Sequence, residues 1–101
     1  MQSSPGRTLC GVFGGDADLE GGRSWLTDDD GRRHEVRYPE GWEVRFEREI
    51  VLLGPTGEPY AHPGDRICVW GSPVAADAVA VAVPRIFEAV SVEGHFRRRD
   101  D

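Results

Sequence analysis

The segment of residues 33–47, RHEVRYPEGWEVRFE, reads almost as a mirror image of itself around a central Pro-Glu-Gly. Proline presets the backbone of a first turn position, and glycine accepts the left-handed conformation that closes a short loop. Folding the segment there sets charged residues opposite residues of the other sign, as in Arg37–Glu43 and Arg33–Glu47. The segment therefore predicts an antiparallel hairpin whose charged pairs share one face.

The other face of this hairpin is apolar and aromatic, because strand side chains alternate between two faces. It carries Tyr38, Trp42, Val36, Val44, His34 and Phe46. A slip of one residue would expose these rings, so both faces specify the same register. A helix through residues 42–53 also fits the apolar spacing and is the alternative, but the opposite-charge pairing favours the hairpin.

Turn-forming residues recur along the rest of the chain, with 13 glycines and 7 prolines among 101 residues. This mixture favours many short strands over a few long helices, and it predicts an all-β chain. We expect strands at residues 8–13, 24–27, 50–53, 58–61, 66–70 and 85–92. Val79, Val81 and Val83 also alternate with alanines before Pro84 ends that element. Residues 74–82 could instead begin as one short helix, because alanine favours it.

The length allows a single core, and therefore one domain. We predict a flexible N-terminus at residues 1–6, a domain at residues 7–96, and a flexible C-terminal tail at residues 97–101.

The order of turn and strand residues carries a family resemblance. The residues concerned are Gly22, Trp25-Leu26, Tyr38-Pro39-Glu40-Gly41, Leu52-Leu53, Gly57, Ala61, Pro63-Gly64-Asp65, Ile67, Val69 and Gly71. The chain resembles small OB-like domains of actinobacterial proteins of unknown function. The resemblance implies a small barrel of about five strands and implies no reaction. With the strand pattern, we expect an OB-like antiparallel barrel of about five to seven strands. A β-sandwich is the alternative fold.

The charge of the chain opposes nucleic-acid binding. The formal net charge is -6, and without the arginine-containing tail residues 1–96 carry -7. Because affinity for nucleic acid comes mainly from neutralising phosphates, we expect no such partner. The OB-like resemblance and the aromatic rings keep single-stranded nucleic acid as an alternative ligand.

Two cysteines, Cys10 and Cys68, are too few for a disulfide scaffold or a four-cysteine zinc site. One bridge between them is the alternative to two buried free thiols, which we expect because cysteine packs as a small hydrophobic residue. The sequence shows neither a signal peptide nor an apolar run long enough to span a bilayer. We therefore expect a cytoplasmic protein with no membrane contact.

Asp16, Asp18 and Glu20 match the opening of a calcium-binding loop. The match fails later in the loop, because Thr27 occupies the position of the bidentate glutamate and Arg23 replaces an apolar residue. We expect no metal, with these three carboxylates as the alternative site.

The histidines, His34, His62 and His95, lack the spacing of paired zinc ligands. We expect His34 to be a hydrogen-bonded core residue. His62 and Asp65 form the one acid/base pair that the sequence offers, so a small hydrolase is a further alternative. The glycine-rich stretches lack the Lys-Ser/Thr of a phosphate loop, and we expect no cofactor.

Aromatic residues are numerous for so small a core, and any that stay exposed are candidate contact residues. We expect a non-catalytic binding or protein-interaction module, monomeric or homodimeric, whose partner is another protein. The candidate ligand-binding residues are Tyr38, Glu40 and Trp42 at the hairpin tip and Trp70.

Overall fold

The computed structural model describes residues 6–18, 22–74 and 85–93, and strands dominate them. Strands make up 61% of these residues, and none of them is helical. The strands are β1 (Arg7–Asp16), β2 (Arg23–Thr27), β3 (Arg33–Arg37), β4 (Glu43–Arg45), β5 (Val51–Leu53), β6 (Pro59–Ala61), β7 (Arg66–Val74) and β8 (Arg85–Val92). The all-β prediction is confirmed. The helix expected near residues 74–82 falls outside the described residues, except for Val74 at the end of β7.

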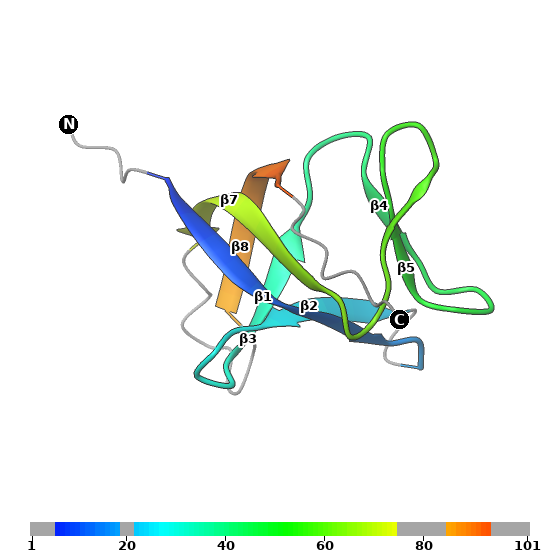
Figure 1. Cartoon of the computed structure of the whole chain (residues 1–101), viewed down its shortest axis with the longest axis horizontal. Coiled ribbons are helices and arrows are strands. Elements are labelled where there is room, and N and C mark those ends of the chain that lie inside the picture. Colours follow the sequence, from blue (N-terminus) through cyan, green and yellow to red (C-terminus); the bar gives the residue numbers. More distant parts are fainter. Residues whose placement is uncertain (1–5, 19–21, 75–84, 94–101) are drawn as a thin grey trace, which may run out of the picture.

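Five strands close into a barrel in the order β1-β2-β3-β8-β7, with β7 returning to β1 (Figure 1). Four neighbouring pairs are antiparallel, whereas β3 and β8 run parallel, with Val36 opposite Phe87. The barrel is therefore confirmed, but the expectation that all its strands are antiparallel is wrong for this pair. Parallel neighbours need a long crossover connection, and the chain between β3 and β8 provides it.

The chain between β3 and β7 forms a second, three-stranded sheet in the order β4-β5-β6, beside the barrel (Figure 1). Both of its strand pairs are antiparallel. Pro59 begins β6 at an edge of this sheet, as predicted, because proline cannot donate a ladder hydrogen bond. Tight turns form as expected at residues 54–57 and 62–65, closed by backbone hydrogen bonds of 2.9 and 3.0 Å.

The hairpin predicted for residues 33–47 is wrong, although its turn forms. The Trp42 amide donates to the Pro39 carbonyl at 3.1 Å, and Gly41 has the left-handed φ of 97° that the turn requires. The flanking strands then separate, because β3 pairs with β2 and β8 while β4 pairs with β5. A cross-strand charge pair contributes about 1 kcal/mol at most, so burial of side chains such as Val36 inside the barrel decides the pairing.

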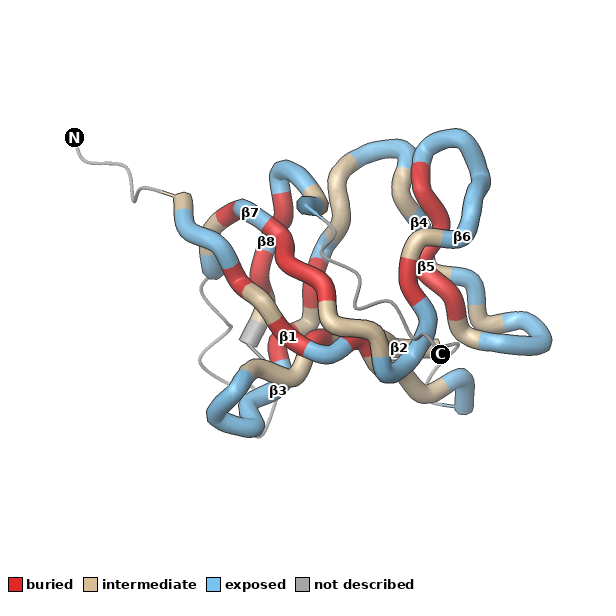
Figure 2. Tube along the Cα trace, in the orientation of Figure 1, coloured by how far each residue is buried: buried red, intermediate tan, exposed pale blue. Residues whose placement is uncertain are grey.

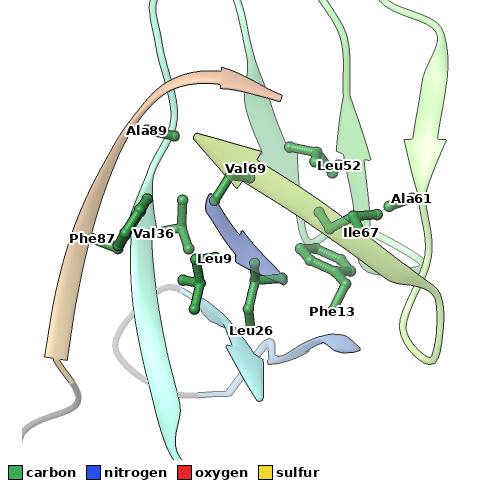
Figure 3. Close-up of a cluster of buried hydrophobic side chains, with 10 residues drawn as sticks. All are labelled: Leu9, Phe13, Leu26, Val36, Leu52, Ala61, Ile67, Val69, Phe87 and Ala89. Atoms are coloured by element: carbon green, nitrogen blue, oxygen red, sulfur yellow. The ribbon is translucent and has the colours of Figure 1, made fainter. Parts of the chain in front are cut away.

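One hydrophobic core fills the barrel and reaches the second sheet (Figure 3). Its largest fully buried side chains are Phe13, Phe87, Leu26, Leu52, Ile67 and Val69. Along β1, buried residues alternate with more exposed ones, as Figure 2 shows. Burying one such side chain contributes about 1.5–3 kcal/mol, so this core supplies most of the stabilisation.

The two cysteines are joined by a disulfide, which corrects the expectation of free thiols. Cys10 of β1 and Cys68 of β7 are direct register partners, with an S–S distance of 2.03 Å. Barrel closure brings them together across 58 residues of sequence. This register depends on the whole ring of strands, and no local sequence pattern indicates it.

Candidate functional site

The predicted contact residues lie on different surfaces. Tyr38 and Trp42 pack against the core, Glu40 is exposed in the turn between them, and Trp70 is exposed on the barrel. The aromatic residues at the predicted tip therefore join the barrel to the second sheet, which leaves Glu40 as the exposed member.

Tyr38 is a core residue with an unusual hydroxyl. Its oxygen is buried and has no hydrogen-bond partner among the residues that the structure describes. Burial raises the pKa of this phenol well above its ordinary value. The hydroxyl is therefore neutral at physiological pH, and it is not available to a ligand at the surface.

Trp42 meets Tyr60 edge-to-face, with ring centroids 4.8 Å apart and an interplanar angle of 88°. Its indole also covers Gly54, where a Cβ atom would lie 3.7 Å from the ring. These contacts fix Trp42 within the junction between the barrel and the second sheet.

Trp70 lies on the outer side of β7, since Ile67 and Val69 are fully buried and strand side chains alternate. Its side chain is directly opposite Thr8 of β1 and Ser91 of β8. The backbone at Gly6 packs so closely on the indole that a Cβ there would collide with it. One part of the ring is thus covered, and Trp70 is still 40% exposed.

The exposed large hydrophobic side chains of the described chain lie on three adjacent strands of the barrel. They are Val12 (40% exposed), Trp70 (40%) and Val90 (62%), on β1, β7 and β8. These strands are adjacent in the barrel (Figure 1). The disulfide lies between Val12 and Trp70, because Cys10 is two residues from Val12 and Cys68 two residues from Trp70. We call this set the β7 face: Val12, Cys10, Cys68, Trp70 and Val90.

Charged residues border the β7 face. Arg66 lies opposite Val12 at one end and is held by Asp29 at 3.0 Å. Glu88 is in register with Arg37 on the β3 side, and Glu93 follows β8. The face itself presents apolar side chains and the hydroxyls of Thr8 and Ser91.

A half-buried aromatic residue, Trp25, lies on the outer side of β2 beneath the exposed Arg33 of β3. The Arg33 guanidinium stacks 4.3 Å from the centroid of the Trp25 ring. Trp25 and Arg33 share the side opposite the buried Leu26 and His34. The interpretation that Arg33 pairs with Glu47 is therefore wrong, since Arg33 lies over an indole on the barrel.

The pair His62 and Asp65 adopts the geometry of a turn. The Asp65 carboxylate accepts a hydrogen bond from the His62 backbone amide at 2.9 Å. The His62 imidazole instead approaches the Glu49 carboxylate, at 3.6 Å, and both of these side chains are well exposed. Asp65 thus orders the backbone rather than orienting the imidazole, and exposed groups of this kind are weakly coupled.

In the acidic loop that begins at the end of β1, the Asp16 carboxylate makes a hydrogen bond within the loop itself. Asp16 accepts a hydrogen bond from the Asp18 amide at 2.9 Å, whereas Glu20 lies outside the described residues. Within the described ranges, no three His, Cys, Asp or Glu side chains are placed to hold a metal ion.

His34 is buried and hydrogen-bonded, as predicted. Its Nε2 lies 2.8 Å from Oδ2 of Asp28, and its exposed fraction is 5%. Asp28 also accepts hydrogen bonds from the amides of Asp30 and Arg32, both at 2.9 Å. The hydrogen bond with the His34 side chain is the largest cause of a lowered pKa of the Asp28 carboxyl, and the hydrogen bond from the Arg32 backbone amide is the second. This pair fixes the turn between β2 and β3.

Comparisons with protein-family models, curated proteins and solved structures find no match to this chain. The part of the chain that the structure describes contains no helix that is both long and apolar enough to cross a membrane. The geometry of the site is therefore the basis for the function proposed below. Sequence reasoning identified Trp70 but missed Val12 and Val90, because only the barrel register places them on one face.

Proposed function

We propose that this chain is a non-catalytic protein-interaction module that contacts its partner through the β7 face. The supporting observation is that Val12, Trp70 and Val90, the exposed large hydrophobics of the described chain, lie on the adjacent strands β1, β7 and β8, of which the disulfide links β1 and β7. Solvated faces of antiparallel sheets are ordinarily polar, and exposed apolar patches commonly mark interaction sites.

Burial of aromatic and aliphatic side chains would supply the affinity. Each square ångström of apolar surface removed from water contributes about 25 cal/mol, and tryptophan is among the residues that dominate interface energetics. Such binding depends weakly on salt, in contrast to binding driven by phosphate contacts.

Photo-crosslinking tests this proposal in the cells that produce the protein. A photoreactive phenylalanine analogue replaces Val90 in one version of the full chain and the exposed Thr56 in the control. We expect an adduct from position 90, none from position 56, and loss of the adduct when Trp70→Asp is added. Absence of any adduct at position 90, or an adduct that survives Trp70→Asp in a folded protein, contradicts the proposal.

The resemblance to OB-like domains and the cytoplasmic location stay predictions. A closed ring of five strands with one parallel pair supports the first. The disulfide opposes the second, because structural disulfides persist mainly in oxidising compartments.

Single-stranded nucleic-acid binding is a second candidate, supported by the stack of Arg33 on Trp25. Aromatic rings and guanidinium groups on one sheet surface can stack on bases and contact phosphates. Electrophoretic mobility shifts with single-stranded oligonucleotides at low salt test it. This candidate requires retardation of a single strand that Trp25→Ala and Arg33→Ala each weaken, and the absence of retardation with every strand removes it.

A further inference from the structure

We propose that the β7 face binds a second copy of this chain, giving a dimer with two-fold symmetry. The inference rests on the proposed function and names the partner. Trp70 and Val90 form an exposed apolar surface of low charge on a strongly acidic chain. The Cys10–Cys68 disulfide lies next to Trp70 along β7, with Cys68 itself buried.

The charge distribution selects this partner. Residues 38–65, which contain β4, β5 and β6, hold six carboxylates and two arginines, a net charge of -4 of the total -6. A basic partner would be attracted to that sheet rather than to the β7 face. Two copies that meet through the β7 face bring few carboxylates together, since Arg66 is already paired with Asp29 and Glu88 is beside Arg37.

The topology determines how the copies meet. The barrel is closed, so β1, β7 and β8 have neighbours on both sides and offer no free edge for an added strand. A partner on this side must therefore pack against side chains. The edges of the three-stranded sheet, β4 and β6, lie outside this face.

The order of the apolar groups suits a two-fold axis. Along the face, Val12 is followed by the disulfide, then by Trp70 and Val90. An axis between the disulfide and Trp70 would bring Val12 of one copy towards Val90 of the other, and the reverse. A symmetric dimer requires this reciprocal pattern, because the same surface serves both copies.

Analytical ultracentrifugation of the full chain tests the dimer over protein concentrations from about 1 µM to about 1 mM. We expect reversible dimerisation that becomes tighter as salt rises, because salt screens the repulsion between two chains of charge -6. An ion-paired interface would show the opposite salt dependence.

Three variants identify the surface. We expect Val90→Asp and Trp70→Asp each to raise the dimer dissociation constant at least about tenfold. Thr56→Asp, in the exposed turn between β5 and β6, should leave it unchanged. Circular dichroism verifies that each variant is folded, and Val90→Asp maintains the test if Trp70→Asp unfolds.

The possible results separate this inference from the proposed function. A wild-type chain that stays monomeric at all concentrations overturns the dimer, as does a dimer that persists in folded Val90→Asp and Trp70→Asp. In the crosslinking experiment, an adduct with the mass of two chains supports the dimer. An adduct of another mass that depends on Trp70 overturns the dimer but supports the proposed function.

Discussion

Cys10 of β1 and Cys68 of β7 are direct register partners, in the strand pair through which β7 returns to β1 and closes the barrel. The disulfide between them links strands that are 58 residues apart in sequence. It therefore holds together β1 and β7, two paired strands that lie far apart in the sequence. The bridge belongs to the β7 face, which we propose for binding.

Replacing both cysteines by alanine should lower the free energy of unfolding by about 4 kcal/mol, because a loop of this length is no longer closed in the unfolded chain. Urea unfolding of the oxidised protein and the double variant measures the difference. Reduction of the wild type with dithiothreitol is the control and should give a similar loss. Equal stability of the oxidised and reduced wild type would contradict the structural role of the bridge.

Replacing Asp28 by asparagine should make stability less dependent on pH in the acid range. The pKa of Asp28 is lowered in the folded protein from an ordinary value of 3.8, mainly by the bond with His34. The contribution of Asp28 to stability is therefore complete at a pH above its pKa in the unfolded chain. It is lost as the pH falls through its lower pKa in the folded protein. Urea unfolding from pH 7 down to about pH 2 should show the gap between wild type and Asp28→Asn closing below about pH 4.

The neighbouring Asp30 provides the control for this measurement, since its carboxylate is exposed in the same turn. Asp30→Asn removes one negative charge from the same turn and leaves the Asp28 carboxylate with its hydrogen bonds to His34 and Arg32. A gap for Asp28→Asn that is constant down to the lowest pH would show that the carboxylate charge has no role in this turn.

Replacing Gly71 by alanine should strongly destabilise the barrel. An added Cβ at Gly71 would collide with the backbone carbonyl of Glu88 on the adjacent β8, and backbone cannot rotate away as a side chain can. We expect a loss of about 3 kcal/mol or more. The control is Gly54→Ala, whose Cβ would make an ordinary contact 3.7 Å from Trp42. Comparable losses in the two variants would contradict the close approach of β7 and β8.

Removing the Tyr38 hydroxyl should leave stability unchanged or raise it by up to about 1 kcal/mol, because a buried oxygen without a partner is unfavourable. Tyr38→Phe and Tyr38→Ala separate the hydroxyl from the ring. The alanine variant should lose about 3 kcal/mol, since the ring packs against the core. A clear loss of stability in Tyr38→Phe would show that the hydroxyl has a bonding partner.

Local chemistry in the sequence determined the elements of this protein. Alternating apolar residues specify the strands, and glycine or proline specifies the turns, as at Gly41, because both depend on neighbours within a few residues. The burial of His34 was also predictable, since its place in a strand alternates with charged residues.

Only the tertiary structure decided which strands pair. Arg37 and Glu43 have complementary charges on either side of a formed turn, yet Arg37 aligns with Glu88 and Glu43 with Leu53. Pairing between strands distant in sequence is governed by the burial of a shared core, which exceeds the weak attraction of exposed charges. The disulfide and the β7 face both follow from this ring of pairings, so neither is visible in any short stretch of the chain.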